Sequence, residues 1–149
     1  MTGRANQSPG KLPATARWLG RLGLIPFIAL AACILLANQH PTLLTRALAA
    51  YSFGILSFLA GAWWGLALVK RHPSALLISN AFFLVVFFSY LLLSTRAYLV
   101  VGAVVFLAQL IVEQKHPMFR PQPSYYARMR IQLSVTAATA LLLAATIPA

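Results

Sequence analysis

Acidic residues are almost absent from this sequence: Glu113 is the only one, against twelve lysines and arginines. Charged residues make up 9% of the 149 positions, whereas a soluble domain carries about 25%. The composition therefore excludes an ordinary soluble domain. A net charge of +11 could indicate a nucleic-acid partner. Here the cations cluster at the ends of apolar runs, as membrane topology requires, so we predict no nucleic-acid binding.

The residue sets that carry most enzyme and metal chemistry are also lacking. The chain has one cysteine, Cys33, so no disulfide forms within it. It has no Cys-x-x-Cys, His-x-x-His, phosphate-binding glycine loop or Ser-His-Asp set. Each of the three histidines, His40, His72 and His116, precedes a proline, and we interpret these pairs as helix stops. We predict no enzymatic activity, no cofactor and no metal site.

Long, continuously apolar runs are what the sequence does have. The longest, residues 47–69, reaches about 35 Å as a helix, against a bilayer core of about 30 Å. Continuous apolarity excludes the alternating pattern of a membrane barrel. We predict an all-α membrane protein with one domain, residues 18–149, of five transmembrane helices at about 18–37, 47–69, 75–93, 97–112 and 131–147. Residues 1–17 are predicted to form a flexible basic tail, with a cleaved signal peptide or a mitochondrial transit peptide as alternatives.

The cations predict the orientation of these five spans. Ten of the twelve fall on one side, and only Arg46 and Arg96 fall on the other. The positive-inside rule then gives an antiparallel bundle with its N-terminus inside and its C-terminus outside. Aromatic residues expected to anchor the inner boundary are Trp18, Trp63, Trp64, Tyr125 and Tyr126. We expect anionic lipid headgroups to meet the inner cations, in a bacterial inner membrane or, alternatively, a mitochondrial inner membrane.

The second run carries a stripe of small residues at helical spacing. Gly54, Ser57, Gly61 and Gly65 recur every three or four residues, so they share one face. Such a face lets helix backbones approach closely in lipid. We predict that this helix is the hub of the bundle and that these residues are its packing motif.

Three polar side chains are candidates for an intramembrane polar site. Gln109 and Glu113 lie one helical turn apart on the fourth run, and a carboxylate near a membrane is a functional candidate. The structural alternative is an ion pair between Glu113 and Arg128 or Arg130. Asn80 in the third run is expected to hydrogen-bond between helices.

Two motifs resemble a known family. They are Tyr51-x-x-Gly54-x-Leu-Ser-Phe58-x-x-Gly61-x-x-Trp64-Gly65 and Tyr126-x-x-Met-Arg130-x-x-Leu-Ser134. Both are similar to segments of the proteobacterial membrane family of unknown function that includes mitochondrial transmembrane protein sixty-nine. The resemblance implies a small multi-span protein and no definite activity.

Three hypotheses of function follow. The first is a non-enzymatic accessory or assembly component of the inner membrane, with other membrane proteins or a second copy as partner. The second is a small proton- or cation-coupled transporter or channel that uses Glu113 and Gln109. The third is a quinone- or haem-contacting subunit, with Trp63 and Trp64 as the contact.

Overall fold

The computed structural model describes residues 11–36, 41–121 and 124–147. They form α1 (Lys11–Leu36), α2 (Pro41–Lys70), α3 (Pro73–Leu92), α4 (Thr95–Lys115), the 3-10 helix η1 (Pro117–Phe119) and α5 (Ser124–Thr146). Each of the five α-helices is long and apolar enough to cross a membrane. The predicted all-helical fold with five such helices is confirmed.

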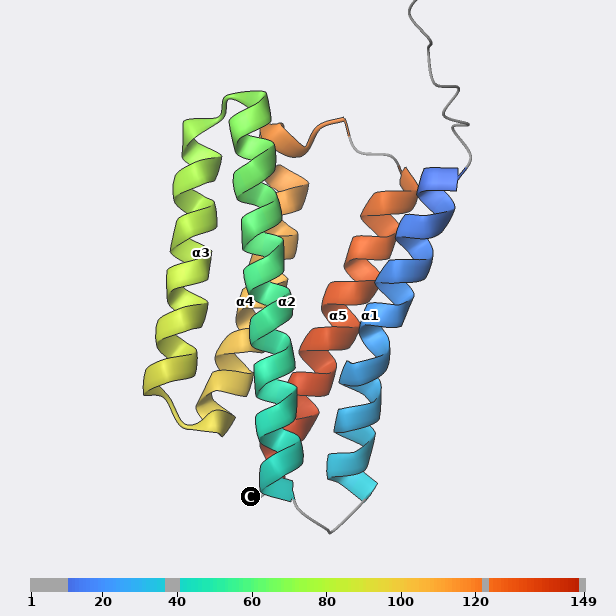
Figure 1. Ribbon diagram of the computed structural model, residues 1–149, viewed down its shortest axis with the longest axis vertical. Coiled ribbons are helices and arrows are strands. Elements are labelled where there is room, and N and C mark those ends of the chain that lie inside the picture. The colour runs from blue at the N-terminus through green and yellow to red at the C-terminus, as the bar shows by residue number, and fades with distance from the viewer. Residues whose placement is uncertain (1–10, 37–40, 122–123, 148–149) are drawn as a thin grey trace, which may run out of the picture.

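Helix α2 lies at the centre of the arrangement, because it contacts each of the other four α-helices. On one side it packs against α3 and α4, and on the other it faces α1 and α5, which lie side by side (Figure 1). The start of α1, the α2–α3 turn and η1 lie at one end of the bundle (Figure 1). The α3–α4 turn lies at the opposite end.

The face of α2 that makes these contacts is not the glycine face. Its buried residues include Leu48, Ser52, Leu56, Ala60, Trp63 and Ala67, which recur every three or four positions and share one face. Gly54, Gly61 and Gly65 are exposed on the other side. A Cβ atom added at any of the three would meet nothing within 4 Å.

The predicted role of these glycines in packing the bundle is therefore wrong. The buried face combines small residues with large ones, so Ser52 and Ala60 allow close approach while Leu56 and Trp63 fill the space between helices. This mixed face thus gains the many dispersion contacts of large side chains as well as close approach of the backbones.

All five helices also begin before the predicted limits. α1 starts at Lys11, so a flexible tail is wrong for residues 11–17; Pro13 fits the first turn, where backbone N–H groups have no intrahelical acceptor. α5 starts at Ser124, seven residues before the predicted span at 131. Residues 1–10 of the tail, and the turn at 37–40 with His40, lie outside the described residues.

The connection from α4 to α5 is more ordered than its prolines suggest. Pro117 opens η1 instead of an extended segment, since proline suits the first helical position. Met118 and Phe119 are buried, in a small cluster with Trp63, Ala67 and Ala75. This connection therefore forms part of the core at its end of the bundle.

Gly102 on α4, outside the predicted motif, packs closely against the neighbouring helices. A Cβ atom at Gly102 would lie 3.4 Å from Leu141 Cδ1 on α5 and 3.9 Å from Leu56 Cδ1 on α2.

We expect Gly102→Leu to lower the free energy of unfolding by about 1–3 kcal/mol through overpacking. Gly61→Leu, into open space, should change it by less than about 1 kcal/mol. Unfolding in mixed micelles with a denaturing detergent measures both, and equal losses would contradict this packing.

Candidate functional site

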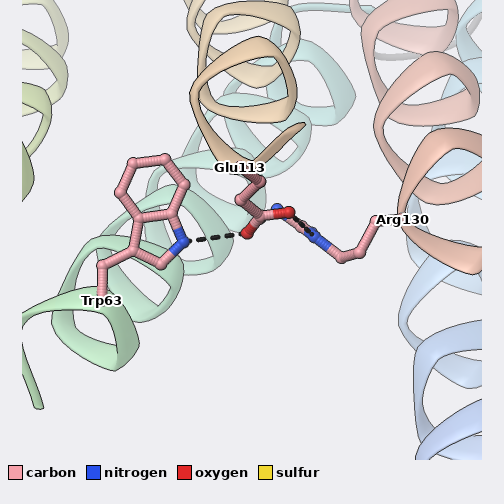
Figure 2. Close-up of polar contacts among 3 residues, drawn as sticks. All are labelled: Trp63, Glu113 and Arg130. Atoms are coloured by element: carbon pink, nitrogen blue, oxygen red, sulfur yellow. Dashed lines mark hydrogen bonds and ion pairs between the residues drawn. The ribbon is translucent and has the colours of Figure 1, made fainter. Parts of the chain in front are cut away.

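The only acidic side chain of the protein lies inside the bundle. Glu113 is in the last turn of α4 and is 3% exposed. Its Oε2 accepts a hydrogen bond of 2.6 Å from Nε of Arg130 on α5. Its Oε1 accepts bonds of 2.9 Å from Arg130 Nη2 and 2.8 Å from Nε1 of Trp63 on α2. Figure 2 shows the carboxylate between the indole and the guanidinium, so one side chain joins three helices.

Charge and geometry explain why Arg130 occupies this place. The C-terminal end of a helix disfavours an anion, and an isolated buried carboxylate is strongly destabilising. Arg130, 6% exposed, binds both carboxylate oxygens with the parallel fork that a guanidinium offers. Of the two cations predicted as partners of Glu113, the structure selects Arg130, whereas Arg128 is exposed.

The position of Trp63 corrects its predicted role as an interface anchor. Its side chain is 4% exposed and packs against the rings of Phe82 and Phe119, with centroids 5.6 and 5.0 Å away. An indole N–H in such apolar surroundings needs an acceptor, and Glu113 provides it. Trp64, the next residue, is exposed, so the two indoles do not form one stacking surface.

The layer next to this ion pair contains polar side chains without partners. Gln109, one turn before Glu113, is fully buried, and neither its Oε1 nor its Nε2 has a hydrogen-bond partner among the described residues. Ser134, one turn after Arg130, is buried and its Oγ has none there either. Leaving such groups unsatisfied costs about 1–3 kcal/mol each. The structure thus places Gln109 and Glu113 on one buried face, as predicted from their spacing.

Asn80 does not belong to this site. It is exposed, and its Nδ2 donates to the carbonyl oxygen of Leu76, one turn back in its own helix, at 3.0 Å. The expected hydrogen bond between helices is therefore wrong. Ser57, a member of the predicted packing motif, has no hydrogen-bond partner for its Oγ among the described residues.

The remaining predicted anchors are accessible. Trp18, Trp64 and Tyr125 are exposed, and Tyr126 is half-buried. Their contact with a membrane interface stays a prediction.

Two histidines come together near the same end of the bundle. The rings of His72 and His116 have centroids 5.9 Å apart. Nδ1 of His116 accepts from the backbone N–H of Met118 at 3.2 Å, so this ring caps η1. Within the described ranges no group of three or more His, Cys, Asp or Glu residues could hold a metal ion.

Several polar contacts between helices escaped prediction. Ser79 of α3 donates to the carbonyl oxygen of Ala60 on α2 at 2.7 Å, and Tyr51 donates to that of Gly23 on α1 at 2.9 Å. Ser52 and the buried Tyr98 hydroxyl share a hydrogen bond of 3.3 Å. The spacing of residues in the sequence could have indicated them, because Ser52 and Ala60 lie on the face of α2 that also carries Leu56.

Five apolar helices around a buried ion pair define a multi-pass membrane protein. Residues 12–146 match the family described as "Protein of unknown function (DUF3429)". The match covers most of the chain, which therefore belongs to this family. No curated protein and no solved structure matches it. The predicted kinship with mitochondrial transmembrane protein sixty-nine stays a prediction.

If the Glu113–Arg130 ion pair stabilises the fold, single and double substitutions of the pair should differ in their free energy of unfolding. Arg130→Met should lower the free energy of unfolding by about 3–5 kcal/mol, because it leaves a buried carboxylate without its cation. Adding Glu113→Gln to it should restore part of that loss, since the uncompensated charge is then gone. Unfolding in mixed micelles measures the double-mutant cycle.

The matched control is Arg128→Met, an exposed arginine two residues away on the same helix. It should change the stability by no more than about 0.5 kcal/mol. An equal loss for the two methionine variants, or a strictly additive double variant, would show that the pair does not stabilise the fold.

Proposed function

We propose that the protein is a non-enzymatic accessory or assembly component of a bacterial inner membrane, with a helix of another membrane protein or of a second copy as its partner. The observation that carries this proposal is the outward glycine face of α2, formed by Gly54, Gly61 and Gly65, with open space around each. Lipid gives helices no hydrophobic reason to associate, so a bare face favours close packing of a further helix.

The buried ion pair supports a structural role over transport. Both oxygens of Glu113 already accept hydrogen bonds from Arg130 or Trp63. Three of the about four lone-pair sites of this carboxylate are used in this way, so a proton or cation would compete with donors that stabilise its charge. Trp63 and Trp64 differ in burial, so a quinone or haem would not find a paired indole surface.

For the orientation, we propose an antiparallel five-span topology with the N-terminus inside. The α2–α3 turn carries Arg71 and follows Lys70, and η1 is followed by Arg120; both lie at the same end as the start of α1 (Figure 1). The α3–α4 turn at the other end is followed by Arg96. This distribution supports placing the cation-rich end at the inner leaflet, against anionic headgroups. A mitochondrial inner membrane is the alternative location.

Crosslinking within the membrane tests the partner. In a Cys33→Ala background, Gly61→Cys with a short thiol-directed crosslinker should give a discrete adduct, identified as a second copy or another membrane protein. Adding Gly65→Leu should abolish the adduct, because a branched side chain separates the helices.

Ala81, an exposed small residue on α3, offers the matched control. Ala81→Cys should give no discrete adduct, and Ala81→Leu should leave the adduct at position 61 intact. The absence of any adduct at position 61, or an equal one at position 81, would refute the accessory role.

Reporter fusions test the topology separately. A reporter enzyme that is active only outside the inner membrane should be active when fused after Ala149 and inactive when fused after the α2–α3 turn. An odd number of spans requires the chain ends to lie in opposite compartments. Activity in the reverse pattern, or both ends in one compartment, would contradict the proposed orientation.

A further inference from the structure

A hollow lined by cations lies between the N-terminal parts of α1 and α5. Its volume is about 280 Å³, and its polar lining is Arg17, Arg21, Tyr125, Arg128 and Gln132. The two helices run side by side from the same end of the bundle (Figure 1). The hollow therefore lies at the level where α1 and α5 begin, at the cation-rich end.

The packing of α1 on α5 brings the three guanidinium groups together. A Cβ atom at Gly20 would lie 3.2 Å from Leu133 Cδ1 and 3.3 Å from Met129 Sδ, so glycine lets the helices approach closely here. Arg17 and Arg21 are one turn apart on α1 and share a face. Arg17 also lies over the ring of Tyr125, with Cζ 5.8 Å from its centroid, a cation–π contact that holds it at the hollow.

Three like charges in one hollow repel each other unless an anion lies among them. Glu113 is the only acidic side chain in the sequence, and it is bound by Arg130 and Trp63 inside the bundle. The chain thus has no other acidic side chain to place among Arg17, Arg21 and Arg128. The charge balance of this hollow calls for an anion from outside the chain.

We infer that this hollow binds the phosphate group of an anionic phospholipid. Guanidinium groups match the geometry of phosphate oxygens, and the amide of Gln132 adds a neutral donor. Farther along both helices the lining becomes apolar, with Leu24 and Leu133. A lipid uses that wall for its glycerol and acyl portion, whereas a free phosphate ion does not. Basic hollows between membrane helices are established headgroup sites in general.

This inference requires only that the protein resides in a membrane, and it needs no partner protein. Failure of the lipid site would leave the crosslink at position 61 unaffected, and failure of that crosslink would leave the lipid site unaffected. The two proposals can thus fail separately.

Native mass spectrometry of the full-length protein, released from mild detergent, tests the site. Phosphatidylglycerol and phosphatidylcholine are titrated in parallel, with inorganic phosphate as a competitor. The wild type should retain phosphatidylglycerol in preference to phosphatidylcholine. The double variant R21Q/R128Q should bind phosphatidylglycerol about twenty-five-fold more weakly, at about fivefold for each arginine removed.

The matched control is R46Q/R96Q, which removes two exposed arginines outside the hollow and should keep the wild-type preference. R21K/R128K, which keeps the charges, should retain most of the binding. This variant controls for a loss of folding when both arginines are replaced. The inference is overturned if both glutamine pairs lose binding equally, or if phosphatidylcholine binds as well as phosphatidylglycerol. Displacement of the lipid by millimolar inorganic phosphate would also overturn the lipid assignment.

Discussion

The structure depends on how one carboxylate is accommodated among apolar helices. Glu113 is the only anionic side chain in a chain with twelve cations, and it lies in the interior and not at the surface. Burying it without partners would cost far more than the protein's stability allows. Arg130 and Trp63 together provide three hydrogen bonds, from two different helices, to its two oxygens. The positions of α2, α4 and α5 at this end of the bundle follow from that requirement.

The same arrangement separates two kinds of surface. The interior face of α2 combines small residues with Leu56 and Trp63, and it is buried in contacts with the other helices. The opposite face, with Gly61 and Gly65, stays open. Since the only acid is bound by Arg130 and Trp63, no other acidic side chain of this sequence can pair with the remaining arginines. The open glycine face and the cation-lined hollow are two separate surfaces, and we propose a different external partner for each.

Run length and spacing were enough to predict part of this structure. Continuous apolar runs predicted the number of helices. An ion pair of Glu113 was predicted with either Arg128 or Arg130, and the structure shows that the partner is Arg130. The limits of the helices could not be predicted as well. Pro13 and Pro117 lie in first turns, where proline is tolerated, so a proline does not mark the end of a helix there. The face of α2 that contacts the other helices could not be predicted from the sequence either. Two faces of that helix carry small residues, and only the positions of the neighbouring helices and of Phe119 decide which one is buried.

The most direct test of the central claim is a solid-state NMR measurement on the protein in lipid bilayers. Magnetisation transfer between the side-chain nitrogens of Arg130 and the carboxylate carbon of Glu113 reports their contact, and hydrogen exchange of the Trp63 indole N–H reports its bond. Strong transfer together with a slowly exchanging indole proton is the predicted result. No transfer, with an indole proton that exchanges as fast as that of the exposed Trp18, would contradict the account.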